Sequence, residues 1–296
     1  MSMTRREVRS LDFQDFVSVE QFCRYWDSSP DGAIAISDKL PIHLHWTNKN
    51  AANTVICFSG ASMKVREVPF WTGHGLAPKV NANFLLVSDP TMLLDRTLNL
   101  GWYAGSRDQP DLIETLTEIF RAVTPGTRPI FFGTSGGGWA ALKYASRFDG
   151  AVAVVVNPQV DIARYKYFPN YLRKAWNTEK GSEQLPFEGN VARDYSKGND
   201  ATVVYVQNAR DYHHLDEHFE LFKSECGSPE KLIELLPDLG PGHIAPARES
   251  LVDILKEVVS SRSISELRAN LSSLPIKSSG TNKEIQVKAS STFQQK

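Results

Sequence analysis

Short apolar runs rich in β-branched residues alternate with segments of helical period along most of this chain. Runs typical of buried strands occupy residues 54–58, 83–88, 129–132, 151–156, 201–206 and 231–236. Apolar residues recur every three or four positions in residues 111–123, 139–148 and 244–259. Strands that are apolar on both faces belong to parallel sheets covered by helices on both sides. The pattern therefore predicts an α/β fold with a mostly parallel sheet, as one domain over residues 1–262.

Three regions depart from this alternation. Residues 33–36 and 40–46 flank a polar turn and predict an antiparallel hairpin at one edge of the sheet. Residues 161–200 are rich in aromatic side chains and predict a lid over the carboxyl edge of the sheet, where open α/β sheets bind ligands. A surface insertion that packs on the core is an equal alternative. Residues 263–296 are rich in Ser, Lys, Asn and Gln and predict a disordered tail.

Charge and cysteine content exclude several classes of protein. Lys plus Arg number 33 and Asp plus Glu 34, which argues against a nucleic-acid binder that relies on phosphate neutralisation. The longest fully apolar run, residues 151–156, is far shorter than the roughly 20 residues of a membrane-spanning helix. The 3 cysteines form no CxxC pair, so we expect neither disulfides nor a structural zinc site. No apolar stretch follows the basic residues at the N-terminus, so we expect no secretory signal. These features favour a cytoplasmic protein.

The most informative motif is the G-x-S-x-G sequence at residues 133–137, with Ser135 at its centre. An apolar strand is predicted before it and a helix with small residues after it. A sharp strand-to-helix turn needs small neighbours and lifts the serine hydroxyl above the sheet at a helix N-terminus. A phosphate-binding turn is the alternative, but no Lys-Ser or Lys-Thr pair follows the glycines.

A serine hydroxyl becomes a good nucleophile only when a base takes its proton. The candidate base is His243, in a Gly-Pro-Gly-His sequence after the last predicted strand. The candidate acid is Asp211, which follows the strand at residues 201–206 and would fix the tautomer of the histidine. Asp216 is a weaker substitute. The alternatives are a solvated loop histidine and a surface aspartate in a salt bridge.

With these motifs in the order Ser135, Asp211, His243, the chain resembles the alpha/beta-hydrolase superfamily over residues 33–262. The resemblance implies that Ser135 attacks an acyl carbon, that His243 carries the proton and that Asp211 orients His243. It implies an oxyanion hole made by the backbone N–H groups of Gly136 and Ala61, with Ser59 where many relatives have histidine. It implies no metal and no cofactor. The side chains expected to line the substrate pocket are Ser62, Trp102, Tyr103, Tyr165, Tyr167 and Tyr171.

A second, more local resemblance involves residues 155–159, Asn208 and residues 100–105. These segments are similar to bacterial hydrolase-fold proteins associated with capsule or surface-glycan assembly, including the acetyltransferase-like component of an accessory secretion system. The resulting hypothesis is a serine hydrolase that cleaves a small-molecule or glycan acyl ester through acyl-Ser135. The alternatives are an acyltransferase that acts on a glycan and a non-catalytic hydrolase-fold partner in glycan assembly or export.

A cluster of histidines suggests one further possibility. His214 and His218 are four residues apart in a predicted helix, a spacing found in pairs of metal ligands. The H-E-x-x-H arrangement is absent, so a solvated helix start is the favoured interpretation. His213 or His214 is alternatively expected at the mouth of the pocket, beside Asp211.

Overall fold

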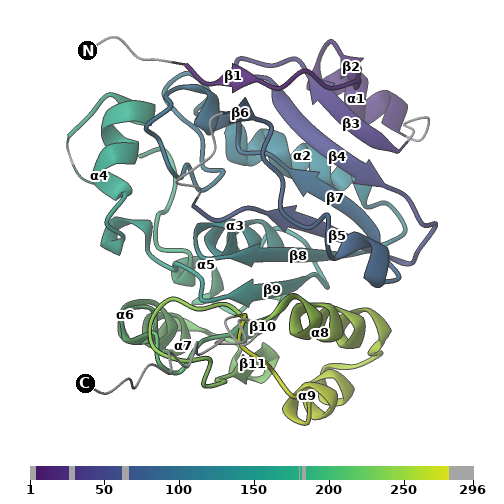
Figure 1. Cartoon of the computed structure of the whole chain (residues 1–296), viewed down its shortest axis with the longest axis vertical. Helices are drawn as coiled ribbons and strands as arrows, with labels where there is room; N and C mark the ends of the chain where they lie inside the picture. The colour runs from purple at the N-terminus through teal and green to yellow at the C-terminus, as the bar shows by residue number, and fades with distance from the viewer. Residues whose placement is uncertain (1–4, 27–30, 62–66, 180, 182–184, 280–296) are drawn as a thin grey trace, which may run out of the picture.

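The apolar runs of the sequence form the middle of one large sheet. The structure is a computed structural model that describes residues 5–26, 31–61, 67–179, 181 and 185–279. Within these residues nine strands form a mixed sheet in the order β11-β10-β9-β8-β5-β7-β4-β3-β2. Figure 1 shows this sheet extending from β2 at one edge to β11 at the other. A separate small sheet pairs β1 with β6.

The strands are β1 (Glu7–Val8), β2 (Phe13–Phe16), β3 (Gly32–Ile36), β4 (Ile42–Thr47), β5 (Asn53–Phe58), β6 (Glu67–Val68), β7 (Asn83–Val87), β8 (Arg128–Thr134), β9 (Val152–Val156), β10 (Thr202–Val206) and β11 (Leu232–Leu235). The α-helices are α1 (Val19–Tyr25), α2 (Leu112–Val123), α3 (Gly136–Ala145), α4 (Phe168–Tyr171), α5 (Ala192–Tyr195), α6 (Tyr212–His214), α7 (Glu220–Glu225), α8 (Arg248–Ser260) and α9 (Ile264–Ser272).

The pairing of the strands confirms the predicted fold class. β7, β5, β8, β9, β10 and β11 are parallel neighbours in that order. β3 and β4 form the predicted antiparallel hairpin, and β4 is also antiparallel to β7. The carboxyl ends of β5, β8, β10 and β11 therefore lie along one edge of the sheet, and the loops that follow these strands meet there.

Both faces of the central strands are covered by helices, which explains why these strands are apolar throughout. In β9, Ala153 and Val155 belong to a core that also contains buried residues of α1, α2, α3, α5 and α7. Val152, Val154 and Val156 belong to the opposite core, which contains buried residues of α8 and α9. Among the described residues, no helix combines the length and the apolar character needed to cross a bilayer.

The aromatic insertion at residues 161–200 packs on the first of these cores for much of its length. It contains the 3-10 helix η4 (Ile162–Arg164) and the π-helix η5 (Leu172–Trp176), together with α4 and α5. Phe168, Tyr171 and Tyr195 are buried in this core. The alternative of a surface insertion that packs on the core therefore describes these three residues. Tyr165 and Tyr167 differ from them because they are only partly buried.

The prediction of a disordered tail from Ser263 is wrong for the start of that segment. Residues 264–272 form α9, and Leu267 and Leu271 are buried in the second core. Ser263 accepts a hydrogen bond from the N–H of Glu266, and the Glu266 carboxylate accepts one from the N–H of Arg262. This Ser-x-x-Glu pattern is a helix-start signal that composition alone obscures. Residues 280–296 lie outside the described residues.

We expect Leu271→Ala to lower the free energy of unfolding by about 3 kcal/mol, because Leu271 is 1% exposed and its loss leaves a cavity. The measurement is urea unfolding followed by circular dichroism. Leu236→Ala is the matched control, since Leu236 is 47% exposed and should change stability by less than about 0.5 kcal/mol. Equal stability of the two variants would contradict the packing of α9.

Candidate active site

Ser135 occupies the turn between β8 and α3. Its backbone has φ 53° and ψ −119°, a left-handed conformation that is costly for a residue with a side chain. The flanking glycines permit this turn, because a Cβ on Gly133 would overlap the carbonyl oxygen of Gly137. A Cβ on Gly137 would lie 2.5 Å from the carbonyl oxygen of Phe58 in β5. The G-x-S-x-G spacing thus allows α3 to start directly against the sheet.

The Ser135 hydroxyl is held by a side chain from the neighbouring loop. Gln159 Nε2 donates a hydrogen bond of 3.1 Å to Ser135 Oγ, and Tyr165 lines the same cavity as Ser135. Gln159 is completely buried, and its Oε1 accepts a 2.6 Å hydrogen bond from Trp102 Nε1. Gln159 belongs to a segment that resembles glycan-associated hydrolase-fold proteins, but its sequence predicts no role for it. A glutamine three residues after a strand carries no signal that distinguishes it from a solvated loop residue.

Asp211 and His243 lie on different loops and are joined by a hydrogen bond. His243 Nδ1 is 2.6 Å from Asp211 Oδ2. Asp211 follows β10 and caps the N-terminus of α6, whereas His243 lies between β11 and α8. The Asp211 side chain is 6% exposed and that of His243 is 41% exposed. The acid is therefore buried, and the imidazole it orients reaches solvent.

Two buried asparagines fix the loop that carries His243. Asn208 Nδ2 donates to the carbonyl oxygens of Gly240 and Gly242, at 2.8 and 2.7 Å. Asn157 Nδ2 donates to the carbonyl oxygen of Ile244 at 2.9 Å, and Asn157 Oδ1 accepts from the N–H of Asn208. These bonds connect the ends of β9, β10 and β11, so they set the position of the imidazole relative to the sheet.

His214 shares the Asp211 carboxylate with His243. Its Nδ1 lies 3.2 Å from Asp211 Oδ1 and 3.1 Å from Asp211 Oδ2, and its ring stacks on that of His243 with centroids 4.1 Å apart and an interplanar angle of 23°. Burial acts to raise the pKa of Asp211, but hydrogen bonds from His214 and His243 and the charge interactions with them outweigh it and hold that pKa far below its usual range. Burial lowers the pKa of His214 despite its bond to Asp211, so His214 is neutral at neutral pH.

Ser135 and His243 line the same cavity, which has a volume of about 420 Å³. Ala61, Tyr165 and Tyr167 line it as well. The structure thus brings together the three residues that the sequence order singled out, two at the cavity and Asp211 behind the imidazole. Among the described residues, Ser135 Oγ accepts a hydrogen bond from Gln159 and has none with the imidazole, and the His243 ring is hydrogen-bonded through Nδ1 to Asp211.

The two backbone groups predicted to bind an oxyanion flank Ser135. Gly136 is the first residue of α3, so its N–H has no acceptor within the helix. Ala61 lies in the loop after β5 and lines the Ser135 cavity. The N–H of Ser59 donates a 2.7 Å hydrogen bond to the Tyr103 hydroxyl and is therefore already occupied.

Not every aromatic residue expected in the substrate pocket reaches it. Trp102 and Tyr171 are fully buried in the core, because their polar atoms bond Gln159 and the carbonyl oxygen of Gly105 respectively. Tyr103 is also buried, and it lines a different cavity. Tyr165 and Tyr167 do line the Ser135 cavity. Ser62 lies outside the described residues.

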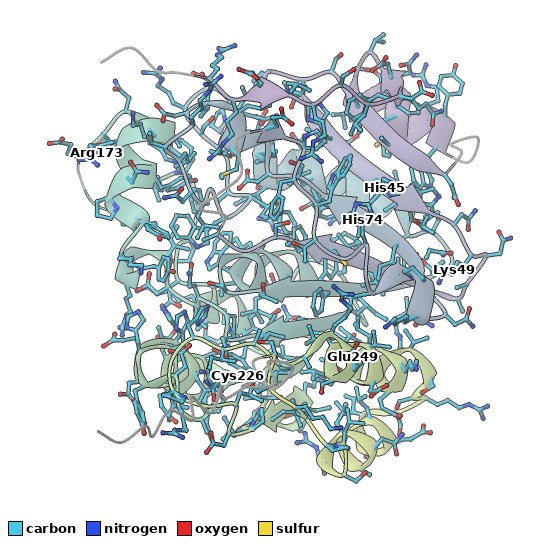
Figure 2. The ribbon with its side chains drawn as sticks, in the orientation of Figure 1. His45, Lys49, His74, Arg173, Cys226 and Glu249 are labelled. Carbon is cyan, nitrogen blue, oxygen red and sulfur yellow. The ribbon has the colours of Figure 1, made fainter. Side chains whose placement is uncertain are left out.

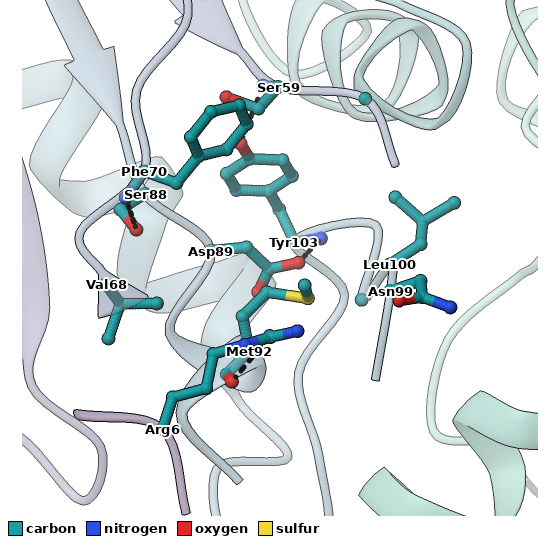
Figure 3. Close-up of a pocket in the computed structure, with 12 residues that line it drawn as sticks. Arg6, Ser59, Val68, Phe70, Ser88, Asp89, Met92, Asn99, Leu100 and Tyr103 are labelled. Atoms are coloured by element: carbon teal, nitrogen blue, oxygen red, sulfur yellow. Dashed lines mark hydrogen bonds between the residues drawn. The ribbon is translucent and has the colours of Figure 1, made fainter. Parts of the chain in front are cut away.

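The cavity that Tyr103 lines is small, about 20 Å³, and Ser59 and Gly60 are among its lining residues (Figure 3). Asp89 and Arg6 form part of its polar wall, and Asp89 Oδ2 accepts a hydrogen bond from the N–H of Tyr103. Neither Ser135 nor His243 lines this space. It holds little more than one water-sized group, so the larger cavity is the candidate active site.

The histidine cluster also contains a group of potential metal ligands. Among the described residues, the one group of three potential ligands is Asp211, His214 and His243, whose ligand atoms lie within 4.8 Å of one another. Both Nδ1 atoms lie at hydrogen-bond distance from the Asp211 carboxylate, so a metal held through them would compete with these two bonds. The His214–His218 pair has no third ligand in this group, and His218 Nδ1 accepts a bond from the N–H of Val160. The arrangement is that of a hydrogen-bonded network.

The other histidines belong to a different part of the molecule. His45 on β4 and His74 pack edge to face with ring centroids 4.8 Å apart, and Figure 2 shows them together over the β4 side of the sheet. His43, also on β4, packs against Phe13. The histidines that contact Asp211 therefore come from α6 and from the loop between β11 and α8.

The chain shares its architecture with several solved structures. No family model matches the sequence, and no curated protein sequence matches it. The capsule O-acetyltransferase of Neisseria meningitidis serogroup A aligns with a TM-score of 0.52 and 15% identity, over 75% of this chain and 95% of that one. A monoacylglycerol lipase of Paleococcus ferrophilus aligns with a TM-score of 0.50 and 13% identity, over 76% and 99% of the two chains.

A chain of the glycosylation-associated Gap123 complex of Streptococcus agalactiae aligns with a TM-score of 0.51 and 14% identity, over 69% of this chain and 41% of that chain. These neighbours are hydrolase-fold proteins. This chain has the alpha/beta-hydrolase fold. At such low identities the likeness establishes the fold alone, and the chemistry has to be argued from the site.

We expect Gly137→Ala to destabilise the protein by about 2 kcal/mol, because its Cβ would press on the Phe58 carbonyl oxygen. Helix propensity alone predicts the opposite sign, a gain of about 1 kcal/mol. The measurement is urea unfolding. Gly126→Ala is the control: it has open space but φ +70°, so we expect a loss of about 1 kcal/mol from backbone strain alone. A more stable Gly137→Ala variant would contradict the tight packing of the turn.

Proposed function

We propose that this chain is a serine hydrolase that cleaves an acyl ester through a covalent acyl-Ser135 intermediate. The observation that carries the proposal is the 2.6 Å bond between His243 and Asp211 beside a cavity that Ser135 also lines. A buried acid, an imidazole that reaches the cavity and a serine on a strained turn are the parts that acyl transfer to serine requires.

In the first half of the reaction, Ser135 Oγ attacks the carbonyl carbon of the ester and its proton passes to His243 Nε2. This requires the hydroxyl to turn from Gln159 towards the imidazole. Catalytic hydrogen bonds commonly form or shorten in this way when the substrate binds. The carbonyl oxygen becomes an oxyanion, which the N–H groups of Gly136 and Ala61 stabilise. When the carbon–oxygen bond of the ester breaks, the leaving alcohol takes the proton from His243 Nε2.

In the second half, water attacks the acyl-Ser135 carbonyl carbon and gives a proton to His243. The bond to Ser135 then breaks, Ser135 Oγ regains the proton and the free acid departs. Asp211 stays ionised throughout, because its pKa lies far below the neutral range. It holds Nδ1 of His243 protonated, so that Nε2 is the atom that exchanges protons with the substrate.

Transfer of the acyl group to a sugar hydroxyl is the second candidate, and Tyr165 and Tyr167 favour it because aromatic side chains at a cavity suit the apolar face of a sugar ring. The acyl intermediate is the same, and only the attacking group changes from water to an alcohol. One structural neighbour is a capsule O-acetyltransferase, which agrees with this chemistry without deciding it. We further propose that residues around Tyr165 act as a lid that decides how freely water reaches the acyl-serine.

We expect wild-type protein to react with a fluorescent fluorophosphonate and Ser135→Ala not to react, since the probe bonds only to an activated serine. His243→Ala and Asp211→Asn should each label at least about 1,000-fold more slowly, because the base or its orientation is lost. Gel fluorescence gives the rates. Ser260→Ala removes an exposed serine hydroxyl and is the matched control, with labelling equal to wild type. A folded wild type that does not label would support a non-catalytic partner instead.

Hydrolysis and transfer are distinguished by the fate of the acyl group. With p-nitrophenyl acetate as the acetyl donor, a hydrolase should release the acetyl group as free acetate even when glucosamine or another sugar is present as an acceptor. Acetylated sugar in more than about half of the turnovers, measured by mass spectrometry, would instead support the transferase. Tyr167→Ala should lower the transferred share if this ring binds the acceptor, and Tyr212→Ala, an exposed tyrosine outside the cavity, should leave it unchanged.

A further inference from the structure

Four of the chain's histidines gather near the candidate active site, and the proposed reaction uses only His243. His214 differs from the others because it is buried, bonds the same carboxylate as His243 and stacks on its ring. His213 is exposed, and its contacts are with the rings of His214 and His218. His214 is therefore the histidine of this group, besides His243, that contacts the proposed catalytic residues directly.

Given the proposed function, we propose that His214 is a positioning residue that holds Asp211 and the ring of His243 in the geometry for proton transfer. Nδ1 of His214 contacts both oxygens of Asp211, at 3.2 Å from Oδ1 and 3.1 Å from Oδ2, and Nδ1 of His243 lies 2.6 Å from Oδ2. The backbone N–H of His214 also points to Oδ1, at 3.5 Å. The contacts of His214 with both oxygens oppose rotation of the carboxylate and so keep Oδ2 at the His243 ring.

The stacked ring supplies the second part of this role. His243 has glycines at 240 and 242 with φ 96° and 93° before it, and its side chain is 41% exposed. An imidazole on such a loop, bonded only through Nδ1, is free to rotate about that bond. The His214 ring, 4.1 Å away and inclined by 23°, covers one face of it and limits this rotation. Nε2 is then kept towards the Ser135 cavity.

Burial makes this role compatible with the charge that His243 acquires. His214 is 3% exposed, and its Nε2 is buried without a hydrogen-bond partner among the described residues. Burial keeps the ring neutral, so it does not repel the imidazolium that forms on His243. The other chargeable groups at the cavities beside His243 are Arg164, Lys166, Asp211 and His213. None of these covers the face of the His243 ring that His214 covers in the stacked pair.

Three substitutions separate the two parts of the role. His214→Ala removes the donor and the ring, His214→Asn keeps an N–H donor near the position of Nδ1, and His214→Phe keeps an aromatic face without a donor. We expect His214→Ala to label with fluorophosphonate about 10- to 100-fold more slowly, with kcat on p-nitrophenyl acetate reduced in proportion and KM within twofold of wild type. His74→Ala, which removes a histidine that packs on His45 and is remote from Asp211, should behave as wild type.

The pH profile gives a readout that loss of packing alone would not move. Without the His214 donor, Asp211 is a stronger acceptor for His243 and favours its protonated form. The acid limb of the labelling rate should therefore shift to higher pH in His214→Phe and stay in place in His214→Asn. The Asn variant should still label more slowly than wild type because it lacks the ring.

Thermal unfolding of each variant separates this role from a structural one. If His214→Ala fails to fold, the Phe and Asn variants decide the matter. The proposal is overturned if folded variants lose stability but keep the labelling rate and the acid limb of wild type. Wild type that does not label at all overturns the proposed function itself, a different outcome from labelling that ignores His214.

Discussion

The close contact between the start of α3 and the strands beneath it is the constraint on which the site depends. The glycines at 133 and 137 leave no room for a Cβ, and this absence lets the chain turn within one residue from β8 into α3. Ser135 is then forced into a left-handed backbone conformation with its hydroxyl at the edge of the sheet. The surrounding sheet and helix supply the packing energy that keeps this strained residue in place.

The same edge of the sheet brings the other site residues together from distant parts of the chain. Asn157 and Asn208, at the ends of β9 and β10, bond the loop that carries His243. The loop is thereby tied to β9 and β10, and β9 is the neighbour of β8, so the imidazole and Ser135 are held by one hydrogen-bonded frame. In the proposed reaction this frame reduces the motion needed to bring nucleophile and base into contact.

Electrostatics at the site are arranged around one buried carboxylate. Two imidazoles share Asp211, one buried and neutral, the other reaching the cavity. A buried carboxylate is costly unless donors surround it, and three N–H groups meet this need. In our proposal, the contact of His214 Nδ1 with both oxygens of this carboxylate is what makes His214 more than a packing residue.

The amino-acid sequence alone determined the central strands, the hairpin of β3 and β4 and the turn at Ser135. Strand and helix periodicity and glycine spacing are local properties, so they can be recognised without the tertiary structure. The sequence also ordered Ser135, Asp211 and His243 correctly along one edge, since parallel strands place their following loops together. Local sequence could not reveal that Trp102 and Tyr171 would be buried, that Gln159 would hold the serine or that His214 would stack on His243. Those contacts join residues tens of positions apart, so they depend on how the loops and the insertion pack. Composition likewise hid α9, whose few apolar residues become a helix face only because the second core is there to receive them.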